Sequence, residues 1–209
     1  LCSANQVEWV TTGQLSTHLK VSPGTVTSML KTLSEGGLAT YKPYSGVSLT
    51  KAGKALATRM LRRHRLIELF LVKTLDLTWD QVHEEAENME HAVSDFLIDR
   101  IDDSLGRPAT DPHGDPIPTA EGTLRIDISR AVPFSVCVPP VRVRIVRVLN
   151  QQPEFLRYLT EHGLLLGTII AVQQNSTEAG IITAQVGEQV VALGHPAAQQ
   201  LLGEPVEET

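Results

Sequence analysis

The sequence places histidines and glutamates at helical spacing in two neighbouring segments. In the first, His64 and Glu68 lie four residues apart and so share one face of a helix. In the second segment, four such residues fall within an arc of roughly 100° of a helix: His83, Glu87, Glu90 and His91. Imidazole and carboxylate groups that converge from two antiparallel helices are typical of a site for a first-row divalent metal. The absence of thiolates favours manganese or iron over copper(I) or structural zinc.

Two other interpretations of these residues remain open. One is a solvated acidic helix face on which the histidines are incidental. The other is a metal-dependent enzyme, but the Glu-x-x-His motif of di-iron carboxylate bundles is absent, because Asn88 lies three residues before His91 and Leu61 three before His64. The sequence also lacks His-Glu-x-x-His, a nucleophile elbow and a glycine-rich phosphate loop. We therefore predict a metal site without catalysis.

Two long amphipathic helices are expected to carry these residues. The first is predicted from Thr50 to about Leu75, and the second from a capping-box pattern at Thr78 to about Leu105, before Gly106 and Pro108. A helix hairpin with so little core of its own is expected to bury its apolar face in a homodimer.

A winged helix-turn-helix is predicted in front of this hairpin. A short helix over 12–20 is followed by a tight link, and Ser22 and Pro23 begin a second helix that runs to about Glu35. Two β-like stretches within 38–49 flank a turn and would form the wing. The second helix is expected to direct four apolar residues inward: Val26, Met29, Leu30 and Leu33.

The charge distribution favours DNA as the partner of this first region. Residues 1–73 hold ten Lys/Arg and three Asp/Glu, whereas residues 74–209 hold eight and twenty-one, so the net charge of −6 conceals a basic first third. Short hydroxyls and one cation on the outer face of the second helix, at Thr25, Thr27, Ser28 and Lys31, can approach phosphates and base edges closely. A small α+β interaction domain without DNA is the alternative.

The remaining chain predicts a connector and a small β-rich domain. Residues 106–122 are rich in Pro and Gly, and Val141–Val148 alternates as a strand does. A helical turn at 153–162 and strands near 168–173, 181–186 and 189–193 complete a partly open β-barrel, with a disordered tail at 204–209. The predicted fold class is α+β multi-domain: a winged helix-turn-helix over 1–60, a helical domain with connector over 61–122 and a Src-homology-3-like barrel over 123–209.

Composition excludes several other classes of protein. No apolar run reaches 18 residues, so no membrane span is expected. Only Cys2 and Cys137 are present, which excludes a disulfide scaffold and fits a reducing cytoplasm. Because the chain starts at Leu1, within what reads as a structured segment, we expect its N-terminal helix to be truncated.

Three motifs together resemble the diphtheria toxin repressor family. They are Arg-His-Arg-Leu-Ile-Glu at 63–68, Val-His-Glu-Glu-Ala-Glu-Asn-Met-Glu-His at 82–91 and Pro-His-Gly-Asp-Pro-Ile-Pro at 112–118, in a chain with the same domain order. The resemblance implies a cytoplasmic homodimer that binds iron(II) or manganese(II) as corepressor, and then operator DNA of metal-homeostasis genes. It implies no small-molecule substrate.

Two metal sites per subunit follow from this resemblance. The primary site would take Glu87, Glu90 and His91, and a glutamate at 87, where iron-responsive members have a cysteine, favours manganese, with iron(II) as the second choice. In the family the first helix adds a ligand at a position before this chain begins, and Glu8 lies too late to replace it. The ancillary site would take His64, Glu68 and His83, with Gln151 and Glu154 from the C-terminal domain.

Some manganese-type relatives instead use a Cys-Pro-His in the connector, a role open to Asp111-Pro112-His113. The barrel is expected to close over the ancillary metal through Glu154. Metal would fix the spacing of the two recognition helices and so select the DNA-binding state. A winged-helix regulator of a small organic ligand, with no metal role, is the alternative. Six residues match the DNA-facing positions of the family: Ser22, Thr25, Thr27, Ser28, Lys31 and Lys42.

Overall fold

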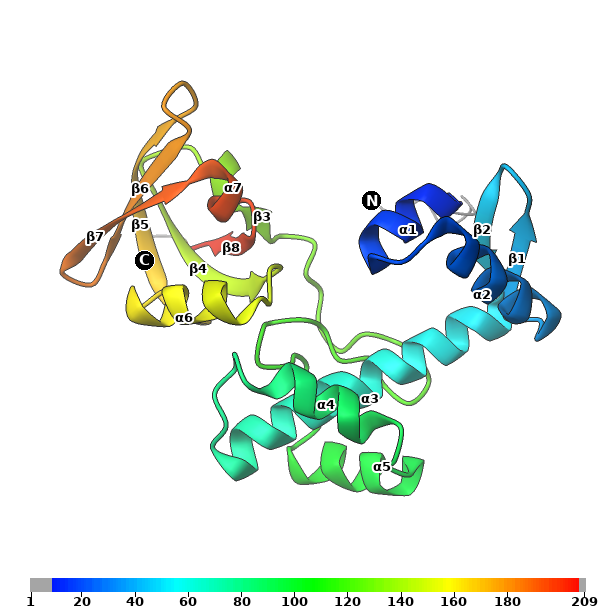
Figure 1. Ribbon diagram of the computed structural model, residues 1–209. Coiled ribbons are helices and arrows are strands. Elements are labelled where there is room, and N and C mark those ends of the chain that lie inside the picture. Colours follow the sequence, from blue (N-terminus) through cyan, green and yellow to red (C-terminus); the bar gives the residue numbers. More distant parts are fainter. Residues whose placement is uncertain (1–8, 207–209) are drawn as a thin grey trace. The chain divides into compact units, whose positions relative to one another are not determined.

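The computed structural model describes residues 9–206, and the chain divides between Met60 and Leu61 into two compact units. The helical and β-rich parts lie together in the second unit. One helix, α3 (Lys51–Leu75), begins in the first unit and continues into the second (Figure 1).

Within residues 9–60, the first unit contains two helices, a β-hairpin and the start of α3. α1 (Thr12–Leu19) starts with a capping box between Thr11 and Gln14, and α2 (Pro23–Glu35) starts at the N-cap Ser22. Strands β1 (Ala39–Lys42) and β2 (Gly46–Leu49) pair antiparallel as the wing. Fewer residues of α2 are buried than predicted: Val26 and Leu30 are buried, whereas Met29 and Leu33 are exposed.

The helical part of the second unit contains three helices where the sequence predicted two. The expectation of one helix over 78–105 was wrong: the chain forms α4 (Val82–Glu90) and α5 (Asp95–Ser104). Ser94 accepts a hydrogen bond from the Leu97 backbone N–H at 3.3 Å and thus caps a new helix. The three helices pack around a core of Leu66, Ile67, Val82, Ala86, Ile98 and Ile117.

The β-rich part is one six-stranded sheet in the order β3-β8-β4-β5-β6-β7. The predicted strands appear as β4 (Val141–Val148), β5 (Ile169–Ser176), β6 (Ile181–Val186) and β7 (Gln189–Gly194), and the predicted helical turn as α6 (Pro153–Glu161). The sequence did not predict the 3₁₀ turn η1 (Phe134–Val136), the short helix α7 (His195–Ala198), or two strands, β3 (Val132–Pro133) and β8 (Leu201–Pro205).

The prediction of a disordered tail at 204–209 was wrong for its first two residues. Glu204 and Pro205 belong to β8 and pair with Arg144 and Val143 of β4, while residues 207–209 lie outside the described part of the chain. Among the described residues, no helix has the length and apolar character needed to cross a membrane.

Candidate metal centre

Helices α3 and α4 bring three of the predicted ligands into one cluster. His64 Nε2 lies 3.1 Å from Glu68 Oε1 and 3.2 Å from His83 Nδ1, and His83 Nδ1 lies 3.3 Å from the same Glu68 oxygen. The candidate ligand atoms of these residues all lie within 4.8 Å of one another. Ligands on opposite sides of one first-row ion are about 4.2 Å apart, since each bond is about 2.1 Å, so this cluster is nearly the size that an ion requires.

The predicted primary ligands lie next to this cluster, where Glu87 and His91 form an exposed edge, but the three are not among the described groups whose ligand atoms all lie within 4.8 Å of one another. Glu90 Oε2 lies 3.0 Å from His64 Nδ1, and the other Glu90 oxygen lies 3.4 Å from His91 Nε2. Glu87 Oε1 lies 3.5 Å from His83 Nε2. The side chains of Glu87 and His91 are 62% and 75% exposed, so this edge is open to solvent in the single chain. Glu8, considered above, lies outside the described residues.

A second, buried cluster shares Glu68 with the first. Glu68, Asp111 and His113 offer ligand atoms within 4.8 Å of one another, and all three are buried. His113 Nδ1 lies 3.7 Å from Glu68 Oε2 and 4.0 Å from Asp111 Oδ1, and it has no hydrogen-bond partner among the described residues. A buried, unbonded imidazole nitrogen that faces two carboxylates suits a divalent cation.

The connector loop that carries Asp111 and His113 lies directly against β4. Gly114 has φ +86, and a Cβ built there would come within 2.1 Å of the Val146 carbonyl oxygen, so only glycine fits without rearrangement. The His113 carbonyl accepts a hydrogen bond from the Val148 backbone N–H at 2.8 Å. Asp111 Oδ1 accepts from the backbone N–H groups of His113 and Asp115, at 2.8 and 2.9 Å. Contacts with β4 and hydrogen bonds within the loop therefore both fix its conformation.

Ionisation in the buried cluster reflects a surplus of carboxylates. Burial raises the pKa of Asp111, and the neighbouring Asp115 adds to this effect, giving about 7. Burial also raises the pKa of Glu68, but His113 and His64 outweigh burial and lower it to about 2. Burial lowers the pKa values of His64 and His113, yet the surrounding carboxylates outweigh it and the net shift of both is upward. A bound cation would stabilise the charged carboxylates.

The two ligands predicted from the C-terminal domain have other partners. Glu154 lies at the start of α6, where its side chain is 79% exposed and contacts Arg157 Nη2 at 3.3 Å. Gln151 donates a hydrogen bond to Asp115 Oδ2 at 2.9 Å. Glu154 belongs to neither cluster of potential ligands among residues 9–206.

Three charged residues around the connector were not predicted as site residues from the sequence: Arg65, Asp115 and Arg147. Arg65 Nε lies 3.6 Å from Asp111 Oδ2, and Arg65 Nη2 lies 3.6 Å from Asp115 Oδ2. Arg147 of β4 forms an ion pair with the other Asp115 oxygen. The repeated Asp at 111 and 115 in a Pro- and Gly-rich loop is the one local signal, but the pairing with Arg65 and Arg147 depends on the fold.

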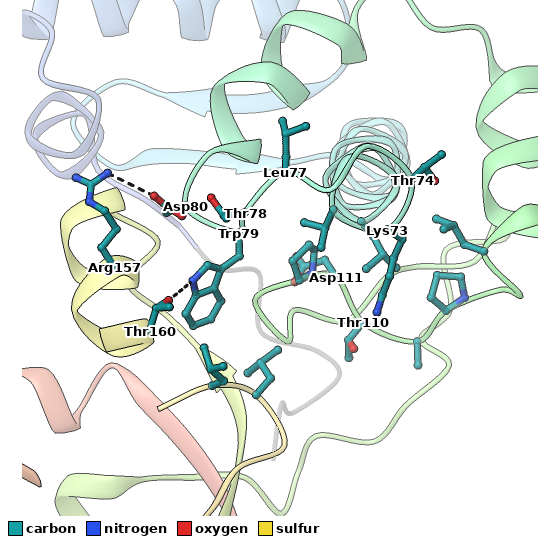
Figure 2. Close-up of a pocket in the computed structure, with 18 of the residues that line it drawn as sticks. Lys73, Thr74, Leu77, Thr78, Trp79, Asp80, Thr110, Asp111, Arg157 and Thr160 are labelled. Carbon is teal, nitrogen blue, oxygen red and sulfur yellow. Dashed lines mark hydrogen bonds and ion pairs between the residues drawn. The ribbon is translucent and has the colours of Figure 1, made fainter. Parts of the chain in front are cut away.

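A cavity of about 1280 Å³ lies beside the buried cluster in the second unit. Residues from the end of α3, the 76–81 loop, the connector and α6 line it, as Figure 2 shows. The Trp79 indole N–H donates a hydrogen bond to Thr160 Oγ1 at 2.9 Å, and Asp80 Oδ2 lies 3.4 Å from Arg157 Nη1 (Figure 2).

In the first unit, most of the predicted DNA-facing residues are exposed. Ser28, Lys31 and Lys42 are exposed, and Thr27 is half-buried. The hydroxyls of Ser22 and Thr25 bond to each other at 2.8 Å, and Thr27 Oγ1 donates to the Pro23 carbonyl at 2.9 Å. The outer face of α2 therefore carries short hydroxyl side chains, which allow close approach to base edges and phosphates.

Three family models match the chain in the order of its parts. "Iron dependent repressor, N-terminal DNA binding domain" matches residues 3–47, and "Iron dependent repressor, metal binding and dimerisation domain" matches residues 50–119. "FeoA domain" matches residues 135–205. The metal-binding match thus ends within the connector, after His113, and includes both clusters of potential ligands.

Curated relatives align with much of the chain. The iron-dependent repressor IdeR of Mycobacterium leprae is 32% identical over 151 residues, which are 71% of this chain and 63% of that relative, so the match spans less than two thirds of its length. The diphtheria toxin repressor of Corynebacterium efficiens is 28% identical over 168 residues, 76% of this chain and 73% of that protein.

Solved structures extend the likeness over nearly the whole chain. A manganese-dependent transcriptional repressor in complex with manganese is 37% identical, with a TM-score of 0.86 over 98% of this chain and 94% of that one. ScaR with bound Cd²⁺ is 32% identical, with a TM-score of 0.81 over 95% of this chain and 92% of that one. The FeoA match and these structures confirm the predicted Src-homology-3-like C-terminal domain.

Proposed function

The chain belongs to the iron-dependent, or diphtheria toxin, repressor family, and on this premise we propose that it is a metal-dependent transcriptional repressor of metal-homeostasis genes. Family members are DNA-binding repressors and not enzymes. The observation that carries the proposal is the pair of His/carboxylate clusters joined by Glu68, within a chain whose first unit is a winged helix-turn-helix.

Manganese(II) is the proposed corepressor, with iron(II) as the second choice. The described ligand atoms are imidazole nitrogens and carboxylate oxygens, and Cys137, a buried cysteine, packs in the core of the β-rich part. Hard oxygen donors suit manganese. The similar structure described as manganese-dependent supports the same choice.

We assign two metal sites to each subunit. Glu87, Glu90 and His91 would hold one ion at the exposed edge, and the exposure of Glu87 and His91 leaves room for a further ligand. Glu68 and His64 would hold the other ion, completed by His83 or by Asp111 and His113. The unbonded Nδ1 of His113 favours the connector residues, because Gln151 and Glu154 would first have to leave Asp115 and Arg157.

A homodimer on double-stranded operator DNA is the proposed active form, and such a protein would act in the cytoplasm. Helices α3 and α5 expose Leu61, Phe96 and Leu97, an apolar surface that a second subunit can bury. Ser22, Thr25, Thr27 and Ser28 would face the groove, with Lys31 and Lys42 on the phosphate backbone. Metal would favour the state in which the two winged helices are correctly spaced.

Fluorescence anisotropy with a candidate promoter fragment tests this function. At fixed salt, graded manganese(II) or iron(II) added after a chelator should raise DNA affinity at least about tenfold, a coupling of about 1.4 kcal/mol. Glu90→Ala should abolish the rise, and Glu84→Ala, an exposed glutamate on the same helix, should retain it. Equal DNA affinity with and without metal would refute the corepressor role and direct attention to an organic effector.

A further inference from the structure

The loop at residues 76–81, between α3 and α4, contacts the buried ligand cluster with one of its residues. The backbone carbonyl of Trp79 lies 2.8 Å from His113 Nε2. The indole and imidazole rings stack at an angle of 13°, with centroids 6.1 Å apart. His113 is completely buried, and this carbonyl and this ring are two of its contacts.

This contact determines which imidazole nitrogen of His113 is available to a metal. A carbonyl oxygen only accepts hydrogen bonds, so Nε2 must carry the proton. The neutral ring then has its lone pair on Nδ1, the atom that faces Glu68 Oε2 and Asp111 Oδ1. Metal-binding histidines commonly donate their second N–H to a backbone carbonyl in this way, which fixes both tautomer and ring orientation.

The same residue also reaches the C-terminal domain. The Trp79 indole N–H donates to Thr160 Oγ1 of α6 at 2.9 Å (Figure 2). The neighbouring Asp80 forms an ion pair with Arg157, which lies about one helical turn before Thr160 in α6. Glu154, the residue that the sequence predicted to connect this domain to the metal, instead points to Arg157 and solvent.

We propose that Trp79 is a positioning residue that presents His113 Nδ1 to the metal and couples occupancy of the buried site to the C-terminal domain through Thr160. The proposal rests on the proposed function, because it requires a metal at the buried cluster. It differs from that function in assigning the connection between metal and β-rich domain to an aromatic residue that is not itself a ligand.

Thr160 allows the connection to be cut without altering Trp79 or any ligand. Thr160→Val removes the hydroxyl that accepts the indole N–H, and Thr160→Ser keeps it. Thr177→Val is a matched control, because Thr177 is exposed in the turn between β5 and β6 of the same domain. The sequence has two tryptophans, so Trp9→Phe leaves Trp79 as the one indole that reports on the site.

The experiment titrates manganese(II) into full-length Trp9→Phe protein, without DNA, and follows both calorimetric binding and Trp79 emission. Trp79 emission should change as the buried site fills. Thr160→Val should weaken that site about three- to tenfold, less than the loss of a direct partner of a ligand, and should shift Trp79 emission. Thr160→Ser and Thr177→Val should stay within about twofold of the parent protein.

Each contrary outcome has a separate meaning. If Thr160→Val binds manganese as tightly as the parent, or if Thr160→Ser weakens binding equally, the coupling role of Trp79 is overturned and the repressor function stands. If the parent protein binds no manganese and no iron, the proposed function fails, and this inference fails with it. Thermal melting of each variant distinguishes a loss of affinity from a loss of fold.

Discussion

The two groups of potential ligands differ in how completely the single chain prepares them. The inner group, Glu68, Asp111 and His113, is buried, and backbone groups hydrogen-bond to the Asp111 and His113 side chains. In the outer group, Glu87, Glu90 and His91, the Glu87 and His91 side chains are exposed. The inner group therefore has its geometry before metal arrives, but it must keep carboxylates buried without the cation. The outer group avoids that cost, and it needs a further element to form a closed site.

This difference suggests separate tasks for the two ions. An ion in the prepared inner group would stabilise the second unit and the contact with the C-terminal domain. An ion in the outer group would bind best when another segment supplies the remaining ligands, so its binding energy can be coupled to a rearrangement of the chain. The predictions below test this division, from the largest expected effect to the smallest.

Glu68→Gln should have the largest effect, because Glu68 contacts His64 and His83 with one oxygen and faces His113 with the other. Loss of this buried carboxylate should weaken manganese binding at the inner group about 100-fold or more, at the upper end of what perturbed metal sites lose. Calorimetry should show one high-affinity site fewer, while Glu84→Gln should keep both. Two unchanged sites in Glu68→Gln would remove Glu68 from the ligand set.

Asp111→Asn should stabilise the metal-free protein at pH 8 and flatten its pH dependence. Burial raises the pKa of Asp111 to about 7, above the unfolded value of about 3.9. The folded state therefore binds the extra proton between these values, so the contribution of Asp111 to stability decreases as pH rises from about 4 to 7 and stays low above. Asparagine can still accept the two backbone hydrogen bonds.

The gain should be on the order of 2 kcal/mol, since each pKa unit corresponds to about 1.4 kcal/mol and solvent relaxation reduces the total. Urea unfolding at pH 5, 6, 7 and 8 in chelator measures it. In saturating manganese, the parent protein should be more stable than Asp111→Asn, because the variant loses a charged ligand. If the variant is less stable than the parent at pH 8 without metal, the charged Asp111 carboxylate does not destabilise the metal-free protein.

His91→Ala should separate the outer group from the inner one. The His91 side chain is exposed and lies 3.4 Å from a Glu90 oxygen, so its loss should leave the melting temperature within about 1 °C. We expect manganese-dependent DNA binding to weaken about tenfold, as for loss of one ligand in an open site. Anisotropy with and without metal measures this. An equal loss of stability and DNA affinity would contradict the division of tasks.

Helical spacing alone suggested Glu87, Glu90 and His91 as candidate ligands, and the reason is physical. These residues, like His64, Glu68 and His83, lie on a helix or at its end, where a spacing of three or four places side chains on one face regardless of the remaining fold. His113 and Asp111 lie in a loop whose position depends on Gly114 against β4 and on Arg65 of α3. Only the family resemblance, and no local spacing, indicated a role for them.

The errors have the same origin. Periodicity continued through residues 91–94, but Ser94 offered a competing cap and the helix ended. β8 is short and carries Glu204, so it becomes a strand only by pairing with β4. The exposed Met29 and Leu33 show that apolar spacing alone does not define which helix residues are buried. A local cap decides the first case, long-range strand pairing the second and tertiary packing the third, and apolar periodicity contains none of these.

Glu154→Ala should have the smallest effect, and it tests the connection between the inner group and the C-terminal domain. The resemblance predicts Glu154 as a ligand, whereas the structure places it on the surface beside Arg157, a pair of the kind that contributes little to stability. Manganese affinity should therefore stay within about twofold of the parent, against about three- to tenfold weakening for Thr160→Val in the same helix. If Glu154→Ala weakens the inner site tenfold and Thr160→Val does not, the C-terminal domain reaches the metal directly, and Trp79 is only a neighbour of His113.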